Sequence, residues 1–275
     1  MTMISINTNY GGIFAAKASS QSQATVDSAM EKLSTGKRIN FAKDDAAGQA
    51  IATRLNAEID GLSMASRNAA DAQSMLDTAE GAMVETHALL LRMRELAVQS
   101  ANGTLTDADR VHTDAEFQQL EAEITRISDN TKWAGQKLLD GSASSLVFQI
   151  GEGANQTITV AITDFAATAG AINTHTRTVS TAANAQLAIT ALDTAIANVS
   201  TQRGNVGAVS NRLTSTMNNL DQVNINLSAS KGRIEDADFA AETGNLAKGQ
   251  ILQQAATAML AQANASKQQV LTLIR

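Results

Sequence analysis

The apolar pattern over residues 51–97 constrains the fold more than any other feature of this sequence. Apolar or small residues recur there at near-heptad steps, with one polar step at Thr86. The positions are Ile51, Leu55, Ile59, Leu62, Ala65, Ala69, Ala72, Leu76, Ala79, Met83, Leu90, Met93 and Ala97. The chain contains no proline that could interrupt a helix of this length, roughly 70–80 Å at 1.5 Å per residue. The pattern predicts a long helix in a coiled-coil bundle.

Further helices are predicted after this one. Asn102-Gly103 ends the long pattern, and Thr106 with Asp109 predicts the capped start of a shorter helix. That helix carries Phe117, Leu120, Ile124 and Ile127. A third helical pattern returns later and is expected to break at residues 230–232; it carries Leu192, Ile196, Val199, Val206, Leu213, Met217, Leu220 and Leu227.

Between these helices the apolar period changes to two. Leu146, Phe148 and Ile150 alternate with other residues, and so do Ile158 and Val160 after a Gly-rich turn. This alternation predicts a small β-hairpin within residues 142–163, lying against the helices. Residues 164–184 are rich in Ala and Thr and show no apolar stripe, so they are interpreted as a short exposed tip.

The two ends of the chain carry narrow apolar seams. The first contains Ala16, Val26, Met30 and Leu33, and the second contains Leu252, Ala256, Met259, Ala263, Val270 and Leu273. Two such helices can pair, but much apolar surface would stay uncovered. The predicted polymerisation interface is therefore Val26, Met30, Leu33, Leu252, Met259, Val270 and Leu273.

Composition argues against several classes of function. The chain has no cysteine, which excludes disulfides, thiol nucleophiles and thiolate-bound metal. His87, His112 and His175 lack metal-ligand spacing, and no constellation supports catalysis, so no enzyme, metal or cofactor is expected. A net charge of −6 gives little support for nucleic-acid binding. Neither a membrane helix nor a Sec-type signal peptide is visible.

Several long strings resemble bacterial flagellin, the subunit of the flagellar filament. The most specific are Leu33-Ser34-Thr35-Gly36-Lys37-Arg38-Ile39-Asn40 and Ala42-Lys43-Asp44-Asp45-Ala46-Ala47-Gly48. Others are Arg94-Glu95-Leu96-Ala97-Val98-Gln99-Ser100-Ala101-Asn102 and Arg233-Ile234-Glu235-Asp236-Ala237-Asp238-Phe239-Ala240. The family's Phe-Asn-Gly appears here as Trp133-Ala134-Gly135, and the large outer domains of longer members are missing.

The resemblance implies a mainly α fold, a long antiparallel helical coiled-coil bundle with a small β-hairpin region. Residues 1–43 and 232–275 would form an inner domain whose helices pair on assembly, and residues 44–231 a long-helix domain. The implied function is a structural subunit of an extracellular flagellar filament, exported unfolded without a Sec signal peptide. Implied partners are other copies of the chain, an export chaperone at the C-terminal segment, the export apparatus, and hook-associated and cap proteins.

The resemblance also implies recognition by Toll-like receptor 5, which binds many flagellins. The matched motif places the corresponding recognition residues at Arg92, Leu96 and Glu116, and the spacing adds Gln99 to the same helical face.

Two alternatives for the function remain open: a hook–filament junction protein, which shares the terminal pattern, and a coiled-coil surface adhesin, which would need an anchor or export signal.

Overall fold

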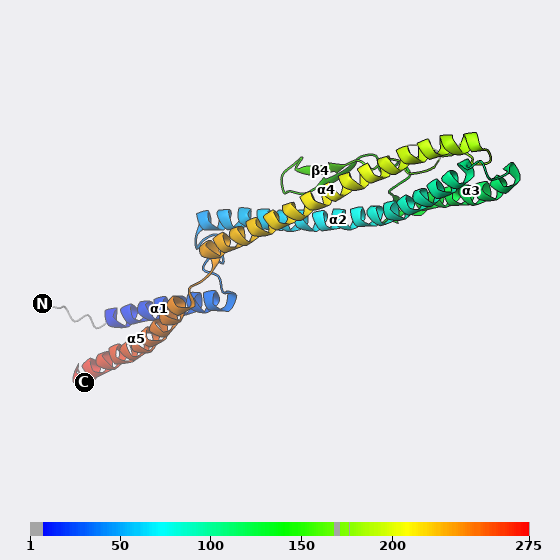
Figure 1. Cartoon of the computed structure of the whole chain (residues 1–275). Helices are drawn as coiled ribbons and strands as arrows, with labels where there is room; N and C mark the ends of the chain where they lie inside the picture. Colours follow the sequence, from blue (N-terminus) through cyan, green and yellow to red (C-terminus); the bar gives the residue numbers. More distant parts are fainter. Residues whose placement is uncertain (1–7, 168–170, 176, 275) are drawn as a thin grey trace. The chain divides into compact units, whose positions relative to one another are not determined.

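The computed structural model describes residues 8–167, 171–175 and 177–274, with only the helical backbone for residues 270–274. Five helices and two small antiparallel strand pairs make up this described part of the chain (Figure 1). The fold is mainly α, as predicted. The chain divides into two compact units, residues 1–57 with 226–275 and residues 58–225.

The first unit is built on two antiparallel helices, α1 (Tyr10–Thr35) and α5 (Phe239–Ile274). The Asn9 side chain caps the start of α1 by accepting a hydrogen bond from the Gly12 amide. Gly36 ends α1 with a left-handed φ of 72°, which glycine adopts without a steric penalty. Strong local signals therefore fix both ends of α1.

Small residues let α1 and α5 approach closely. Ala15, Ser22, Val26 and Ala29 form the buried stripe of α1, and Gly249 and Ala256 are buried on α5. A Cβ at Gly249 would lie 2.8 Å from Val26 Cγ2, so only glycine fits this crossing. The buried stripe is narrow and leaves the other faces of both helices uncovered.

The second unit contains most of α2 (Ala46–Ala101) and α4 (Ala182–Glu235), together with all of α3 (Asp107–Asn130). Within this unit, α2 and α4 run antiparallel, because Glu80 pairs with Arg203 while Arg94 pairs with Asp193 (Figure 1). Their core consists of fully buried side chains in heptad positions, among them Leu76, Met83, Leu90, Met93, Phe117, Ile124 and Leu192. The heptad pattern thus marks the buried seam over most of its length, as predicted, but Ile51 at its start is exposed and Ile59 is half-buried.

The predicted hairpin is present as β3 (Leu146–Gln149) and β4 (Thr157–Val160). Leu146 pairs with Val160 and Phe148 with Ile158, so one apolar face turns to the helices. Asn68 of α2 donates to the Gln149 carbonyl, and Gln202 of α4 donates to the Ala161 carbonyl. These side chains fasten the hairpin to both long helices.

A second, smaller hairpin was missed by the sequence prediction. It joins β1 (Lys132–Trp133) to β2 (Gln136–Lys137) through Ala134 and Gly135, which have φ angles of 47° and 87°. Two positive φ angles define a type I′ turn, for which Asn-Gly is the usual sequence signal. Ala134 in the place of Asn removes that signal.

Two predictions about the chain between residues 164 and 235 are wrong. Five side chains in the segment interpreted as an exposed tip are buried: Phe165, Ala167, Ile172, Thr174 and Val179. An irregular segment can bury isolated side chains without any periodic stripe, which explains the error. The expected break at residues 230–232 is also absent, since α4 continues to Glu235. Residues 168–170 and 176 lie outside the described chain.

Candidate functional site

The outer faces of the terminal helix pair carry large apolar side chains. On α1, Ile13 and Phe14 are 61% and 76% exposed, and on α5, Ile251 and Met259 are 65% and 66% exposed. Tyr10, Met30, Phe239 and Leu252 are exposed as well. So many uncovered apolar residues on two adjacent helices mark an interaction surface.

A groove of about 440 Å³ runs between α1 and α5 within this unit. Phe14 and Ala18 line it from α1, and Leu252, Ala255 and Met259 line it from α5. Most of its remaining lining consists of small residues, so the floor is shallow and apolar. Such a groove can accept an apolar side chain or a helix edge from a partner.

The structure separates the predicted polymerisation residues into different environments. Met30, Leu252 and Met259 are exposed, and Leu33 is half-buried. Val26 is 6% exposed because it packs against Gly249 of α5, which corrects its assignment to a surface open to neighbours. The side chains of Val270 and Leu273 lie outside the described part of the structure.

Two of the flagellin-like strings, residues 33–40 and residues 233–240, lie side by side where α1 ends and α5 begins, within the first unit. The Arg38 amide donates to the Glu235 carbonyl, and the Ala237 amide donates to the Gly36 carbonyl. Lys37 Nζ lies 2.5 Å from Glu235 Oε1, and this contact lowers the pKa of the Glu235 carboxyl. Residues almost two hundred positions apart thus form one crossing, a contact that the sequence strings did not indicate.

Arg92 and Glu116, both predicted for receptor recognition, are in direct contact. Arg92 Nη2 and Nε lie 2.8 and 3.0 Å from Glu116 Oε1, and Arg92 Nη1 lies 3.0 Å from Glu95. The Glu116 and Glu95 hydrogen bonds raise the pKa of Arg92. Gln99 is also exposed. The α2–α3 pair therefore presents a charged, preorganised patch to solvent.

Leu96 does not belong to that patch. Its side chain is 2% exposed and lies in the core with Met93 and Phe117. The predicted role of Leu96 as a surface anchor is corrected, because its position on α2 turns it toward α3. Residues 92 and 96 are one helical turn apart, so spacing alone could not distinguish the exposed member from the buried one.

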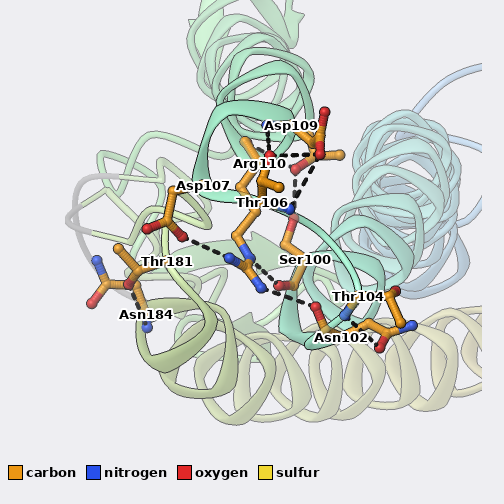
Figure 2. Close-up of polar contacts among 10 residues, drawn as sticks. Ser100, Asn102, Thr104, Thr106, Asp107, Asp109, Arg110, Thr181 and Asn184 are labelled. Atoms are coloured by element: carbon orange, nitrogen blue, oxygen red, sulfur yellow. Dashed lines mark hydrogen bonds and ion pairs between the residues drawn. The ribbon is translucent and has the colours of Figure 1, made fainter.

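Arg110 organises the turn between α2 and α3. Figure 2 shows its guanidinium among Ser100, Asn102 and Asp107. Nε donates to the Ser100 carbonyl at 2.7 Å, Nη2 donates to the Asn102 carbonyl at 2.9 Å, and Nη1 binds the Asp107 carboxylate at 2.6 Å. This buried cation satisfies carbonyl groups that the end of α2 leaves without helical partners.

One face of α3 holds the segment before α4. The Asp114 carboxylate accepts from the Val179 amide at 2.6 Å, and Gln118 donates to the Arg177 carbonyl. Glu121 lies 3.5 Å from His175 Nδ1 and is 6% exposed, and this burial raises the pKa of its carboxyl. Asp114, Gln118 and Glu121 follow helical spacing, so α3 acts as a clamp on this segment.

In the described chain, no cluster of His, Cys, Asp and Glu side chains could hold a metal ion. Among the helices of these described residues, none has the length and apolarity needed to cross a membrane. A long helical bundle combined with a terminal helix pair of exposed apolar surface is the architecture of a filament-forming structural protein.

Comparison with known proteins gives the family. Residues 6–144 match the bacterial flagellin N-terminal helical region, and residues 189–274 match the bacterial flagellin C-terminal helical region. A flagellin of Halalkalibacterium halodurans is 47% identical over 90% of this chain and 91% of its own length. A flagellin of Bacillus subtilis is 42% identical over 98% of this chain and 99% of its own length.

Solved structures agree. The crystal structure of Bacillus cereus flagellin matches with a TM-score of 0.50 and 36% identity, covering 56% of this chain and 88% of that one. A putative flagellar hook-associated protein from Vibrio parahaemolyticus matches with a TM-score of 0.60 at 18% identity, which shows a shared fold alone.

The chain belongs to the bacterial flagellin family and is a structural subunit of the flagellar filament, which is extracellular. Flagellins are structural rather than enzymatic proteins, and the junction-protein and adhesin alternatives are not favoured.

Proposed function

We propose that the chain assembles into its filament through the outer faces of α1 and α5. The observation that carries this proposal is the set of exposed apolar side chains there, led by Phe14, Ile251 and Met259. When another subunit covers such residues, burial stabilises the assembled state by about 25 cal/mol per Å² of apolar surface removed from water. The groove between the two helices gives that subunit a concave place to dock.

Within this surface, Met30, Leu252 and Met259 are the residues proposed to contact neighbouring subunits directly. Leu33 is proposed at the margin, and Val270 and Leu273 are proposed to extend the surface toward the C-terminus. Val26 has a different role, since it holds α1 against α5 inside each subunit. The residues 1–43 and 232–275 together remain our proposed inner domain.

A charge introduced at Met259 tests the surface. Met259→Asp should block filament growth, because docking would bury a carboxylate without a partner. The side chain is 66% exposed, so the subunit should keep its helical content by circular dichroism. Met259→Leu is the matched control and should assemble normally. Normal filaments of the Asp variant in electron micrographs would contradict the proposal.

We further propose that the chain is exported unfolded, and that an export chaperone covers the apolar face of α5. The export apparatus and the hook-associated and cap proteins are the further partners proposed. The thin seam between α1 and α5 supports easy unfolding of the ends, because few side chains are buried there. Amide hydrogen exchange on the monomer tests this: fast exchange is expected in α1 and α5, and slow exchange in α2.

A second proposal concerns Toll-like receptor 5, which we infer to read Arg92, Glu116 and Gln99. The Arg92–Glu116 pair supports it, because the pair is exposed and held on two packed helices. Arg92→Ala monomers should signal less through the receptor while keeping their helicity. Arg126→Ala is the control, since Arg126 also pairs with a glutamate on α3. Equal signalling by the Arg92 variant and the unchanged chain would contradict the assignment.

A further inference from the structure

The turn between α2 and α3 contains the one Asn-Gly pair in this sequence, Asn102-Gly103. In such a pair the glycine nitrogen can attack the side-chain amide carbon of the asparagine, since glycine has no side chain to obstruct the approach. Here Asn102 is exposed, and no residue other than the chain neighbours Asn102 and Thr104 comes within 4 Å of where a Cβ of Gly103 would stand. Both reacting residues therefore have room to move.

Two neighbouring groups favour this attack. The Thr104 amide donates to Asn102 Oδ1 at 3.2 Å, so a donor already faces the oxygen that becomes negative when the nitrogen adds. Arg110 Nη2 donates to the Asn102 main-chain carbonyl at 2.9 Å (Figure 2). A guanidinium on that carbonyl withdraws electrons from the following peptide nitrogen, which makes the Gly103 N–H easier to deprotonate.

We propose that Asn102 is a site of spontaneous deamidation, promoted by the folded α2–α3 turn. The Gly103 nitrogen loses its proton to water and forms a bond to Asn102 Cγ; the side-chain nitrogen takes a proton from water, and the Cγ–N bond breaks to release ammonia. Water then opens the cyclic imide at either carbonyl, which gives aspartate or isoaspartate. The reaction needs only water as a co-reactant, so the product accumulates with the age of the folded chain.

The product changes this turn. It adds one negative charge beside Asp107 and Asp109, and isoaspartate also adds a methylene group to the main chain. In the isoaspartate product the main chain runs through Cγ, so the group that Arg110 Nη2 contacts is a free carboxylate and no longer a peptide carbonyl at the end of α2. The inference is independent of the polymerisation surface, since the turn belongs to the second unit.

The chain provides an internal comparison at Asp140-Gly141. Asp140 Oδ1 likewise accepts from the amide two residues later, Ser142. However, the hydrogen bonds from Ser142 lower the pKa of the Asp140 carboxyl, so this group stays ionised. A carboxylate is a poor electrophile, and Asp140-Gly141 is expected to stay unchanged while Asn102 reacts.

The test follows the tryptic peptide of residues 95–110 during incubation of the folded full-length chain at neutral pH. The isolated peptide, which has the same residues without the folded turn, is incubated in parallel. Conversion of Asn102 to aspartate and isoaspartate is measured by mass, and the isoaspartate by enzymatic methylation. We expect the folded chain to convert at least as fast as the peptide. Retention of Asn102 in the folded chain while the peptide converts would overturn the proposal.

Gly103→Ala tests the route in the full-length chain. Alanine has room at this position, so the fold should be kept. Conversion should be about ten-fold slower, because a Cβ crowds the attacking nitrogen. Conversion at an unchanged rate would show direct hydrolysis instead of imide formation, and would overturn the mechanism.

Discussion

Ala134 shows how one residue can hide a turn from sequence analysis. It holds a φ of 47° at an exposed position, a conformation that costs an L-residue other than Asn or Gly about 1–2 kcal/mol. Ala134→Asn should therefore raise the free energy of unfolding by about 1 kcal/mol. Urea unfolding followed by Trp133 fluorescence measures this, and Trp133 is the chain's single tryptophan. Ala134→Val should shift the midpoint in the opposite direction, and a loss of stability with Asn would contradict the turn assignment.

Glu121 gives a pH dependence whose sign can be worked out. Burial raises its folded pKa above the ordinary value of 4.5, so the folded state holds more protons than the unfolded state above that pH. Stability contributed by this group therefore falls as pH rises through the raised pKa. The charged groups that act on it are His175 on the clamped segment and Asp114 on the same helix. Glu121→Gln should stabilise the chain at neutral pH and weaken this decline in urea titrations; an unchanged pH profile would refute the assignment.

At the scale of elements, periodicity and caps were the reliable signals. The heptad pattern of residues 51–97 predicted α2, and Thr106 with Asp109 predicted the start of α3, where both form a capping box. The expected break at residues 230–232 was wrong because one glycine costs a helix only about 1 kcal/mol. The Lys231–Glu235 ion pair also spans the last turn of α4. The burial of side chains such as Ile172 and Val179 depends on tertiary contacts, among them the hydrogen bond from the Val179 amide to Asp114 of α3, which no local pattern encodes.

Arg110 is the element-scale contact with the largest expected effect. It is 6% exposed and donates to the buried Ser100 carbonyl and to the Asn102 carbonyl, so Arg110→Ala removes the side-chain donor from a buried acceptor; the Asn102 carbonyl keeps the Leu105 amide. A loss of about 2 kcal/mol is expected in the free energy of unfolding. Arg126→Ala is the matched control, since its pair with Glu123 lies in solvent and should change stability little. Equal effects of the two variants would show that Arg110 does not stabilise the turn.

At the scale of the whole molecule, the sequence motifs predicted the family, and the terminal seams predicted an apolar assembly surface. They did not predict which residues of that surface face outward. The seam at each end was recognised, yet Val26 is internal while Met30, one turn later, is exposed. The same ambiguity affected Leu96 beside Arg92. Apolar residues one turn apart differ in burial only through the packing partner, and α5 is more than two hundred residues away from α1 in sequence.

Deletion of residues 234–275 separates the roles of the two units. The second unit has its own core, with Leu76, Met83 and Phe117 fully buried, so it should stay folded without α5. Trp133 packs against that core, and its fluorescence should report an unfolding midpoint close to that of the full chain. The deleted chain should form no filaments, because half of the proposed surface is gone. Filament growth would remove α5 from the assembly surface, whereas a much lower midpoint would show that the second unit depends on the terminal helices.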